Sequence, residues 1–397
     1  MACNKLNSFF VDLHIHLGAT STGKSVKITA SKSMTLENVL NVARDVKGLD
    51  LIGIIDCHVP EVLLQLQELV GRGEFIEKEQ GGLCYKEKIT LILGSEIEVY
   101  DEHSKGPIHV LVYFPYLKIM KLFSDWLAQR VTNVNLSTQR MYEDGITLQK
   151  KVKELGGLFI PAHVFTPFKS LYGKGVVKSV TEVFDLTMID GIELGLSSDT
   201  LMADEVSELQ QFSFLTNSDA HSLANIAREY QKIKMKQPSF EELNRAINGE
   251  AGREIECNYG LNPLLGKYYQ TTCEKCYEAI NDEHKEEGCP QCKNRSYTKG
   301  VAARIIELSM NKDENVLKRK RPPYVHQVPL QFIPTLGPKT LEKLRQYFDT
   351  EMNIIHFATK EQLEKVVSKK IVDYILKARI GELVFDIGGG GKYGKVK

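Results

Sequence analysis

The amino-terminal half of the chain alternates between short apolar runs rich in β-branched residues and amphipathic helical stretches. In order, the first of these segments are FFVDLHI, LENVLNVARDVKG, LDLIGIID, VLLQLQELV and KITLILGSEIEV. Such a β/α rhythm is typical of parallel sheets and barrels, whose functional side chains gather at the carboxyl ends of the strands. The pattern therefore predicts an α/β fold with its active site at one end of the strands.

Eight side chains that can bind metal ions fall at the ends of apolar runs. His14 and His16 are spaced i and i+2, so both point to the same face of an extended strand, and Asp219 and His221 repeat this spacing. A single histidine on an apolar run is more often a hydrogen-bonded core residue, but two such pairs favour a metal centre. The predicted ligands are His14, His16, Asp56, Glu96, His109, His163, Asp219 and His221.

A mixture of imidazoles and carboxylates suits Zn²⁺, Mn²⁺ or Fe²⁺, and Mg²⁺ where oxygen ligands dominate. We expect two or three active-site divalent metals, with Asp219, His14 and His163 as the catalytic residues among their ligands. His58, in the loop after Asp56, and Glu193, in DGIELGL, are either further ligands or ordinary structural residues.

Seven segments resemble motifs of the polymerase and histidinol phosphatase (PHP) superfamily. They are VDLHIHL, IIDCHVPE, LGSEIEV, HVLVYF, IPAHVFTP, GIELGL and TNSDAHS, and they span about residues 8 to 250. The resemblance implies a distorted (β/α)7-type PHP barrel that binds two or three metal ions and acts on phosphoesters. One departure is Asp56-Cys57-His58, where the superfamily usually has Asp-His, so the coordinating side chain of this motif is left open.

Length and charge restrict the remaining possibilities. A chain of 397 residues exceeds what one core usually holds, so two or three domains are expected. Its 51 basic and 51 acidic residues cancel, so any affinity for nucleic acid must come from local patches. The sequence shows no signal peptide and no run approaching the ~20 apolar residues of a membrane-spanning helix, which predicts a soluble, cytoplasmic protein without a membrane partner.

Two CxxC pairs separated by twelve residues predict a structural zinc site, formed by Cys273, Cys276, Cys289 and Cys292. Four thiolates leave no open coordination position, and the metal would supply folding free energy to a short polar segment. A redox dithiol is the alternative. The other four cysteines show no framework spacing, so structural disulfides are not expected.

The carboxyl-terminal part combines a basic linker with a predicted helical region. VPLQFIPTLGPKTLEKLRQYF resembles a helix-hairpin-helix element, whose hairpin amides and helix N-terminus accept a phosphate. Gly337 permits the tight turn, and Gly337 and Lys339 are predicted to bind DNA. The tail DIGGGGKYGKVK, with Lys392, predicts either an anion-binding strand or a flexible terminus. The predicted domains are 1–255 (catalytic barrel), 256–310 (zinc-binding), 311–330 (linker) and 331–397 (DNA-binding helices and tail).

Residues 18–25 satisfy the P-loop pattern G-x4-G-K-S/T, which would suggest nucleotide binding. A P-loop needs a helix that opens directly after its lysine, whereas VKITAS follows here and the next helix is predicted to begin at Thr35. No ATP is therefore expected. Lys24 and Lys32 are predicted instead to face a phosphodiester, with a solvated loop as the alternative.

The order of parts resembles the endonuclease Q family within the PHP superfamily. This resemblance implies a DNA repair endonuclease that hydrolyses the phosphodiester 5′ to a deaminated base (uracil, hypoxanthine, xanthine) or an abasic site, leaving 3′-OH and 5′-phosphate. The implied partner is double- or single-stranded DNA with a damaged base, and a sliding clamp is left open. Phe165, Phe168 and Tyr172 are aromatic candidates for contacting an extruded base or belong to the core.

Three alternatives are a small-molecule phosphatase of the histidinol phosphatase kind, a non-catalytic DNA-binding scaffold and a P-loop ATPase. The zinc segment and the hairpin-type helices disfavour the first, and the near-complete ligand set disfavours the second.

Overall fold

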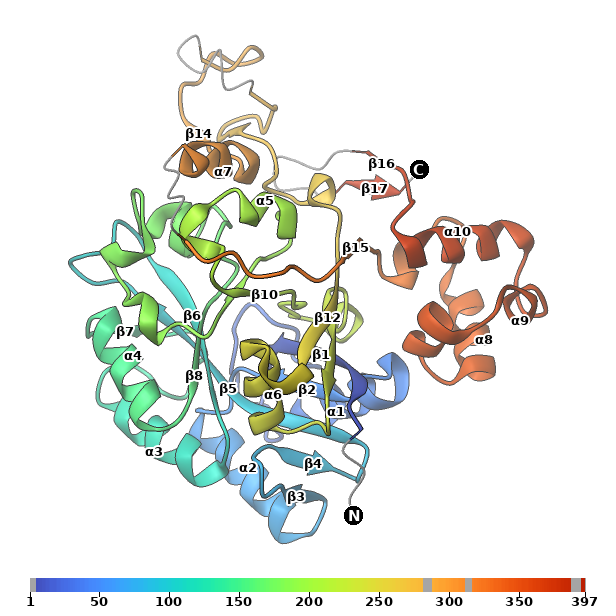
Figure 1. Ribbon diagram of the computed structural model, residues 1–397, viewed down its shortest axis with the longest axis horizontal. Helices are drawn as coiled ribbons and strands as arrows, with labels where there is room; N and C mark the ends of the chain where they lie inside the picture. The colour runs from blue at the N-terminus through green and yellow to red at the C-terminus, as the bar shows by residue number, and fades with distance from the viewer. Residues whose placement is uncertain (1–4, 281–287, 311–315, 387–393, 397) are drawn as a thin grey trace.

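The computed structural model describes residues 5–280, 288–310, 316–386 and 394–396. Its centre is a ring of strands (Figure 1) made of β1 (Asn7–Ile15), β2 (Leu51–Ile54), β5 (Ile89–Val99), β6 (Ile108–Phe114), β8 (Leu158–Pro161), β9 (Gly191–Glu193) and β10 (Ser213–Leu215). β1, β2 and β5 are parallel neighbours, and β9 and β10 also pair in parallel. β6 pairs antiparallel with both β5 and β8.

Isolated backbone contacts complete the ring. Asp190 N donates to Phe159 O at 3.0 Å, which joins the β9 side to the β8 side, and an Ile15–Ala220 bridge joins the end of β10 to β1. The predicted α/β barrel of the distorted (β/α)7 type is confirmed, and β6, which runs against its neighbours, is the main distortion.

Helices that match the predicted rhythm cover the outside of the ring. They are α1 (Leu36–Asn41) with its π-helical continuation (Val42–Lys47), α2 (Pro60–Gly71), α3 (Leu117–Ala128), α4 (Gly145–Glu154), α5 (Thr200–Asp204) and α6 (Phe240–Asn248). The predicted start of α1 is confirmed, since the Thr35 hydroxyl accepts a hydrogen bond from Asn38 N at 3.4 Å. No helix among the described residues is both long and apolar enough to cross a bilayer.

Alternate residues of the strands pack into two different cores. In β6, Leu111 and Tyr113 belong to a cluster with Leu13 on β1, whereas Val110 and Val112 pack in the cluster that contains the apolar faces of the helices. Because both faces of the strands are buried, the strand sequences are nearly continuous apolar runs.

Short strands extend or edge this sheet. A hairpin of β3 (Phe75–Glu77) and β4 (Leu83–Tyr85) flanks β5, which also pairs with β7 (Arg140–Met141). On the other side of β1 follow β11 (Tyr230–Met235), β12 (Glu254–Gly260) and β15 (Tyr324–His326).

Residues 316–326, assigned to a linker by the sequence, lie along the barrel. Arg319 donates to Ile247 O at 2.6 Å, Arg321 pairs with Asp204 at 2.8 Å, and β15 pairs with β12. Because guanidinium groups satisfy several backbone carbonyls here, the basic run is an anchored strap.

Two smaller units project from the barrel (Figure 1). One contains the cysteine pairs, with β13 (Thr272–Cys273), β14 (Tyr297–Thr298) and α7 (Val301–Ser309). The other is helical, with α8 (Pro338–Phe348), a π-helical turn (Asn353–Phe357), α9 (Lys360–Glu364), α10 (Lys369–Ile380) and the pair β16 (Phe385–Asp386) and β17 (Lys395–Val396). The helical unit has its own core, to which Leu261 and Leu265 contribute.

His356 lies where the helical unit meets the barrel. Its ring stacks on Phe10 with centroids 4.6 Å apart, and its Nε2 lies 2.6 Å from the Tyr230 hydroxyl. Burial, with the positive charges of Arg379 and Lys232, lowers the pKa of His356 to about 3.

This depressed pKa predicts acid sensitivity. The unfolded chain binds a proton at His356 below its ordinary pKa of 6.5, whereas the folded chain does so only near 3, so stability is lost as the pH falls through this window. We expect the free energy of unfolding to decrease by up to about 1.4 kcal/mol per pH unit below 6.5. Urea unfolding at several pH values should show a shallower slope for His356→Phe than for wild type, and equal slopes would contradict the prediction. His103→Phe is the control, because the His103 side chain is 56% exposed.

Candidate metal centre

The predicted ligands converge at one end of the barrel. His14 and His16 leave the end of β1, Glu96 lies on β5, and Asp219 follows β10. His109 is at the beginning of β6, and because β6 is antiparallel its first residues lie at the same edge as the ends of the parallel strands. The reversed strand thus adds a ligand that a purely parallel barrel would place at the opposite end.

Glu96 is the central carboxylate. Its Oε1 lies 2.9 Å from His109 Nδ1, 3.5 Å from His163 Nε2 and 3.7 Å from His14 Nε2. Its Oε2 lies 3.4 Å from His16 Nε2. Because its two oxygens face different histidines, Glu96 could contribute to more than one metal site.

Asp219 holds the second junction. Its Oδ1 lies 3.4 Å from His14 Nε2 and 3.7 Å from His16 Nε2, and 3.4 Å from His221 Nδ1. Three groups of ligand atoms result, in each of which all atoms lie within 4.8 Å of one another: His14, His16 and Glu96; His16, Asp219 and His221; Glu96, His109 and His163. This spacing can hold as many as three ions.

Unpartnered buried nitrogens show that these residues fit a metal. Nε2 of His14, Nε2 of His16 and Nδ1 of His163 have no hydrogen-bond partner among the described residues, although all three atoms are buried. Leaving such groups unsatisfied is costly, and an imidazole nitrogen with a free lone pair is a preferred ligand of Zn²⁺, Mn²⁺ and Fe²⁺.

The electrostatics of the cluster are those of closely paired acids and bases. Burial lowers the pKa of His14, but the carboxylates of Glu193 and Asp219 raise it to about 10. Burial raises the pKa of Asp219, yet the surrounding histidines, His14 first, hold it well below its usual range. The Asp219 carboxylate is therefore ionised and available to a cation.

Glu193 lies behind His14. Its two oxygens are 3.0 and 3.1 Å from His14 Nδ1, and they also accept hydrogen bonds from His163 N and from Asn217 Nδ2, each at 2.9 Å. With both oxygens engaged, Glu193 is placed to hold the His14 ring with Nε2 facing the other ligands. Carboxylates in this position fix the orientation and basicity of metal-binding histidines.

We expect Glu193→Gln to weaken metal binding at the cluster by about 10- to 100-fold, because the amide cannot act as the same acceptor for His14. Titration of the metal-free protein with Zn²⁺ or Mn²⁺, followed by calorimetry, measures the effect. Glu254→Gln is the matched control, because Glu254 lies on β12 and its side chain is 55% exposed. Equal affinity in wild type and Glu193→Gln would contradict this orienting role.

The Asp56-Cys57-His58 motif presents one side chain to the site. Asp56 Oδ2 accepts a hydrogen bond from Leu17 N at 2.6 Å and lies 3.3 Å from His16 Nδ1. Cys57 is buried and donates to Ile54 O, and burial raises the pKa of its thiol to about 12. His58 Nδ1 lies 2.7 Å from the Ser95 hydroxyl. The structure thus places Asp56 beside His16, with its Oδ1 buried and without a hydrogen-bond partner among the described residues, and Cys57 and His58 buried. Asp56 as a metal ligand stays a prediction.

Two ligands have strained backbones. His163 has φ 31° and Asp219 has φ 46°, both in the left-handed region that non-glycine residues rarely adopt. Gly195 approaches so closely that a Cβ there would lie 2.8 Å from the Cβ of His163. Such strain is concentrated at functional sites, where the surrounding structure imposes it.

A cavity of about 380 Å³ opens over the ligands. Beyond them its walls include Lys27, Thr166, Phe168, Asn217, Arg228 and Tyr268. Of the aromatic candidates from the sequence, Phe165 and Tyr172 are buried and stacked on each other, whereas Phe168 is 41% exposed.

The lysine beside the metal ligands is Lys27. Its Nζ lies 3.0 Å from Glu96 Oε2, whereas Lys24, 76% exposed, pairs with Glu61 at 2.9 Å, and Lys32 is exposed. An Ala19–Ser25 bridge folds the loop back and brings Lys27 inward. Within the described segment 18–35 no helix opens after Lys24, so this loop lacks the geometry of a P-loop.

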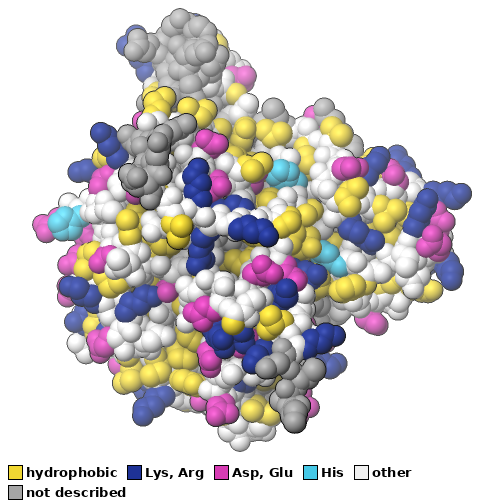
Figure 2. Space-filling view, viewed as in Figure 1, with side chains coloured by type: hydrophobic (Ala, Val, Ile, Leu, Met, Phe, Trp, Pro, Cys, Tyr) yellow, Lys and Arg dark blue, Asp and Glu magenta, His cyan; other side chains and the backbone are white. Residues whose placement is uncertain are grey.

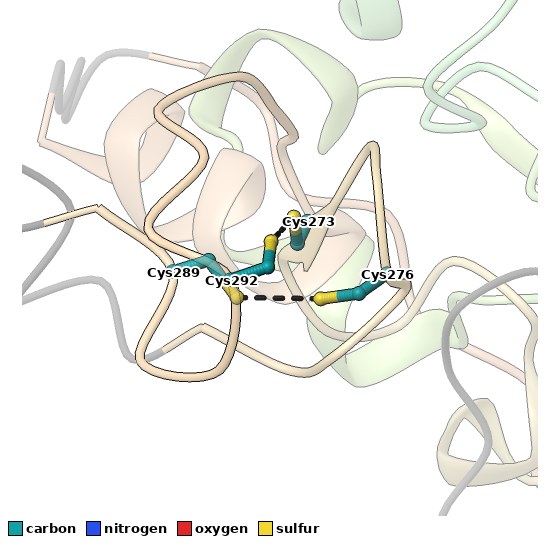
Figure 3. Close-up of side chains that lie close together, drawn as sticks. All are labelled: Cys273, Cys276, Cys289 and Cys292. Carbon is teal, nitrogen blue, oxygen red and sulfur yellow. Dashed lines mark hydrogen bonds between the residues drawn. The ribbon is translucent and has the colours of Figure 1, made fainter.

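The four predicted zinc-binding cysteines come together (Figure 3). Sγ of Cys273 lies 3.6 Å from that of Cys292, and Sγ of Cys276 lies 3.4 Å from that of Cys289. Tetrahedral zinc with bonds of about 2.3 Å sets its sulfurs about 3.8 Å apart, so these residues fit zinc. All seven described cysteines are free of disulfides.

Two of the predicted DNA-binding residues, Gly337 and Lys339, lie at the start of α8 in the helical unit. Gly337 caps the amino terminus of α8, and both Gly337 and Lys339 are exposed. Lys392 lies outside the described residues. A role of this turn in binding DNA stays a prediction.

No protein-family model matches the chain. The uncharacterized protein YqxK of Bacillus subtilis (strain 168) is 53% identical over 393 residues, which are 99% of this chain and 100% of that protein. Among solved structures, the lesion-specific endonuclease PfuEndoQ from Pyrococcus furiosus has a TM-score of 0.84 at 29% identity, over 98% of this chain and 95% of that one. A complex of endonuclease Q with a 27-mer duplex substrate, with an abasic lesion at the active site, has a TM-score of 0.82 at 29% identity, over 98% and 96% of the chains. The likeness thus covers the barrel, the cysteine unit and the helical unit together.

Proposed function

The chain belongs to the family of Bacillus subtilis YqxK and has the fold of endonuclease Q, and from this membership we propose that it is a metal-dependent endonuclease that cuts DNA at damaged positions. The observation that carries the proposal is the convergence of the histidines and acids around Glu96 and Asp219 at the floor of an open cavity. Overlapping ligand groups of this kind suit phosphodiester hydrolysis, in which charge develops on both the attacking and the leaving oxygen.

Divalent ions would supply Lewis-acid chemistry and an activated water. The residues that would hold them are His14, His16, Asp56, Glu96, His109, His163, Asp219 and His221. The residues of the chain do the remaining work. Lys27 places a positive charge at the cavity wall beside Glu96, where a DNA phosphate can bind. Arg228 donates to Ser218 O at 2.6 Å and to Asp219 O at 3.1 Å, which holds the strained turn that presents the Asp219 carboxylate.

We further propose that the protein cleaves the phosphodiester 5′ to a deaminated base (uracil, hypoxanthine or xanthine) or an abasic site, leaving 3′-OH and 5′-phosphate. One relative is described as lesion-specific and another was captured with an abasic lesion at its active site, which supports lesion recognition here. The cavity of about 380 Å³ lies in the range of pockets that hold one small ligand such as a base.

DNA would have to bind through local charge. On the face shown in Figure 2, Lys and Arg side chains are interspersed with Asp and Glu, in keeping with equal numbers of basic and acidic residues in the chain. Affinity for undamaged duplex is therefore expected to be modest and strongly dependent on salt.

The test is incubation of the purified protein with Mg²⁺ or Mn²⁺ and labelled duplexes that carry uracil, hypoxanthine, an abasic site or no damage. We expect incision on the 5′ side of the lesion and none of the undamaged duplex, with product ends identified by end-specific labelling. Release of phosphate from histidinol phosphate, without incision of any duplex, would instead identify a small-molecule phosphatase.

A further inference from the structure

The four-cysteine unit reaches the active-site cavity through one residue. We define this unit as residues 268–280 and 288–309; its cysteines do not line the cavity, but Tyr268, its first residue, does. Tyr268 therefore connects the four-cysteine site to the wall of the catalytic pocket.

The facing wall comes from the loop after His163. Phe168 of this loop meets Tyr268 edge to face, with ring centroids 5.5 Å apart and an interplanar angle of 79°. Two rings at this angle cannot enclose a base between them, but they form an aromatic corner that offers one ring face and one ring edge. Lys174 Nζ lies 5.3 Å from the Phe168 centroid and supports that ring from another side.

Helix α7 fixes both halves of the corner. At its first turn, Val301 N donates to Tyr268 O at 2.9 Å. One turn later, Arg304 donates to the backbone oxygens of Tyr172 at 2.8 Å and Val177 at 2.7 Å, which belong to the loop that carries Phe168. The Arg304 side chain is 12% exposed, and its bond to Tyr172 O is partly buried.

The base of α7 is tied to the cysteines. Gly300 N donates to the Thr271 hydroxyl at 3.0 Å, and a Cβ at Gly300 would lie 2.4 Å from the backbone of Gln270. The strand pair that carries Cys273 opposite Tyr297 leads directly into this turn. The strands of the zinc site are therefore joined to α7, and α7 is hydrogen-bonded to the segments that carry Phe168 and Tyr268. A change at the zinc site can thus alter the distance between the two rings.

We propose that Phe168 and Tyr268 form the surface on which an extruded damaged base stacks, and that Arg304 is a positioning residue that sets this surface through α7. This inference rests on the proposed function and deepens it. Deaminated bases differ at their hydrogen-bonding edges, but each has a π face, so stacking accepts several of them. An abasic site has no base, so its binding should not depend on the aromatic corner.

The test compares duplexes that carry uracil or an abasic site, with binding measured in an Asp219→Ala background so that no cleavage interferes. Tyr268→Ala is expected to weaken binding of the uracil duplex about tenfold and to leave the abasic duplex within about twofold. Tyr268→Phe keeps the ring and should bind like the parent. Tyr277→Ala removes a 64% exposed tyrosine of the same unit and is the matched control.

Arg304→Ala, tested in the cleaving enzyme, is expected to raise KM for the uracil duplex about tenfold without changing kcat or the KM for the abasic duplex. An equal loss on both duplexes, or no loss on either, would overturn the inference. If the parent protein cuts neither duplex, the proposed function itself fails, and this result is distinct from a protein that cuts both duplexes yet tolerates Tyr268→Ala.

Discussion

Asp219→Ala is expected to abolish cleavage of damaged DNA, with the rate falling by at least about 10³-fold. The reason is the central place of this carboxylate, whose Oδ1 lies 3.4 Å from both His14 Nε2 and His221 Nδ1. The same oxygen lies 3.7 Å from His16 Nε2, so the substitution removes a carboxylate that three histidines face. The metal content of the catalytic cluster should fall together with the rate.

Cleavage of the uracil duplex with Mn²⁺, together with metal analysis, measures the effect. Asp125→Asn is the control, since Asp125 is 59% exposed on α3 and pairs with Lys121 on the same helix. Circular dichroism and the zinc content of the cysteine site show whether the fold is intact. A variant that keeps the wild-type rate after losing catalytic metal would contradict the role of Asp219.

The fold was largely predictable because apolar periodicity reports burial. The β/α order of the first hundred residues and the cap at Thr35 both follow from local sequence. The direction of β6 does not, because the run IHVLVYF is equally apolar read in either direction. Only its pairing with β5 and β8 shows that it is antiparallel. Strand direction is a property of long-range pairing that short segments do not encode.

The site was predictable where ligands are spaced i and i+2, as in His14 and His16, since this spacing has a direct geometric meaning. Glu193 was left open because a ligand and an orienting carboxylate differ only in which atoms they face. Lys27 was missed because its position depends on the Ala19–Ser25 bridge. Tyr268 was missed because it meets Phe168 only through tertiary structure.

The position of the strap, residues 316–326, also depends on tertiary contacts that the sequence does not show. A basic run before two prolines indicates a linker by composition, yet Arg319 and Arg321 are held by backbone carbonyls of the barrel. Such anchoring depends on acceptors more than sixty positions away in the chain. Domain boundaries drawn from composition therefore stay predictions.

The junction between barrel and helical unit contains a buried ion pair. Lys47 Nζ lies 2.8 Å from Glu351 Oε2, and the two side chains are 3% and 5% exposed. Lys47 also donates to Ala224 O at 3.2 Å, and Arg345 pairs with Glu351 from the other side. This arrangement connects the π-helical turn after α1 with the segment between α8 and the next helical turn.

Glu351→Ala is expected to destabilise the protein by about 3–5 kcal/mol, because it leaves the ammonium of Lys47 buried without a counter-charge. Urea unfolding measures this loss. The double variant Lys47→Met, Glu351→Leu removes the buried ammonium as well as the carboxylate and should recover part of the stability, since a buried pair contributes little net free energy over a well-packed apolar pair. Recovery is expected to be incomplete because Arg345 still loses Glu351. Asp125→Ala breaks an exposed pair instead and should cost less than about 1 kcal/mol. Equal losses for Glu351→Ala and Asp125→Ala would show that the junction is open to water and that the helical unit is not held to the barrel at this point.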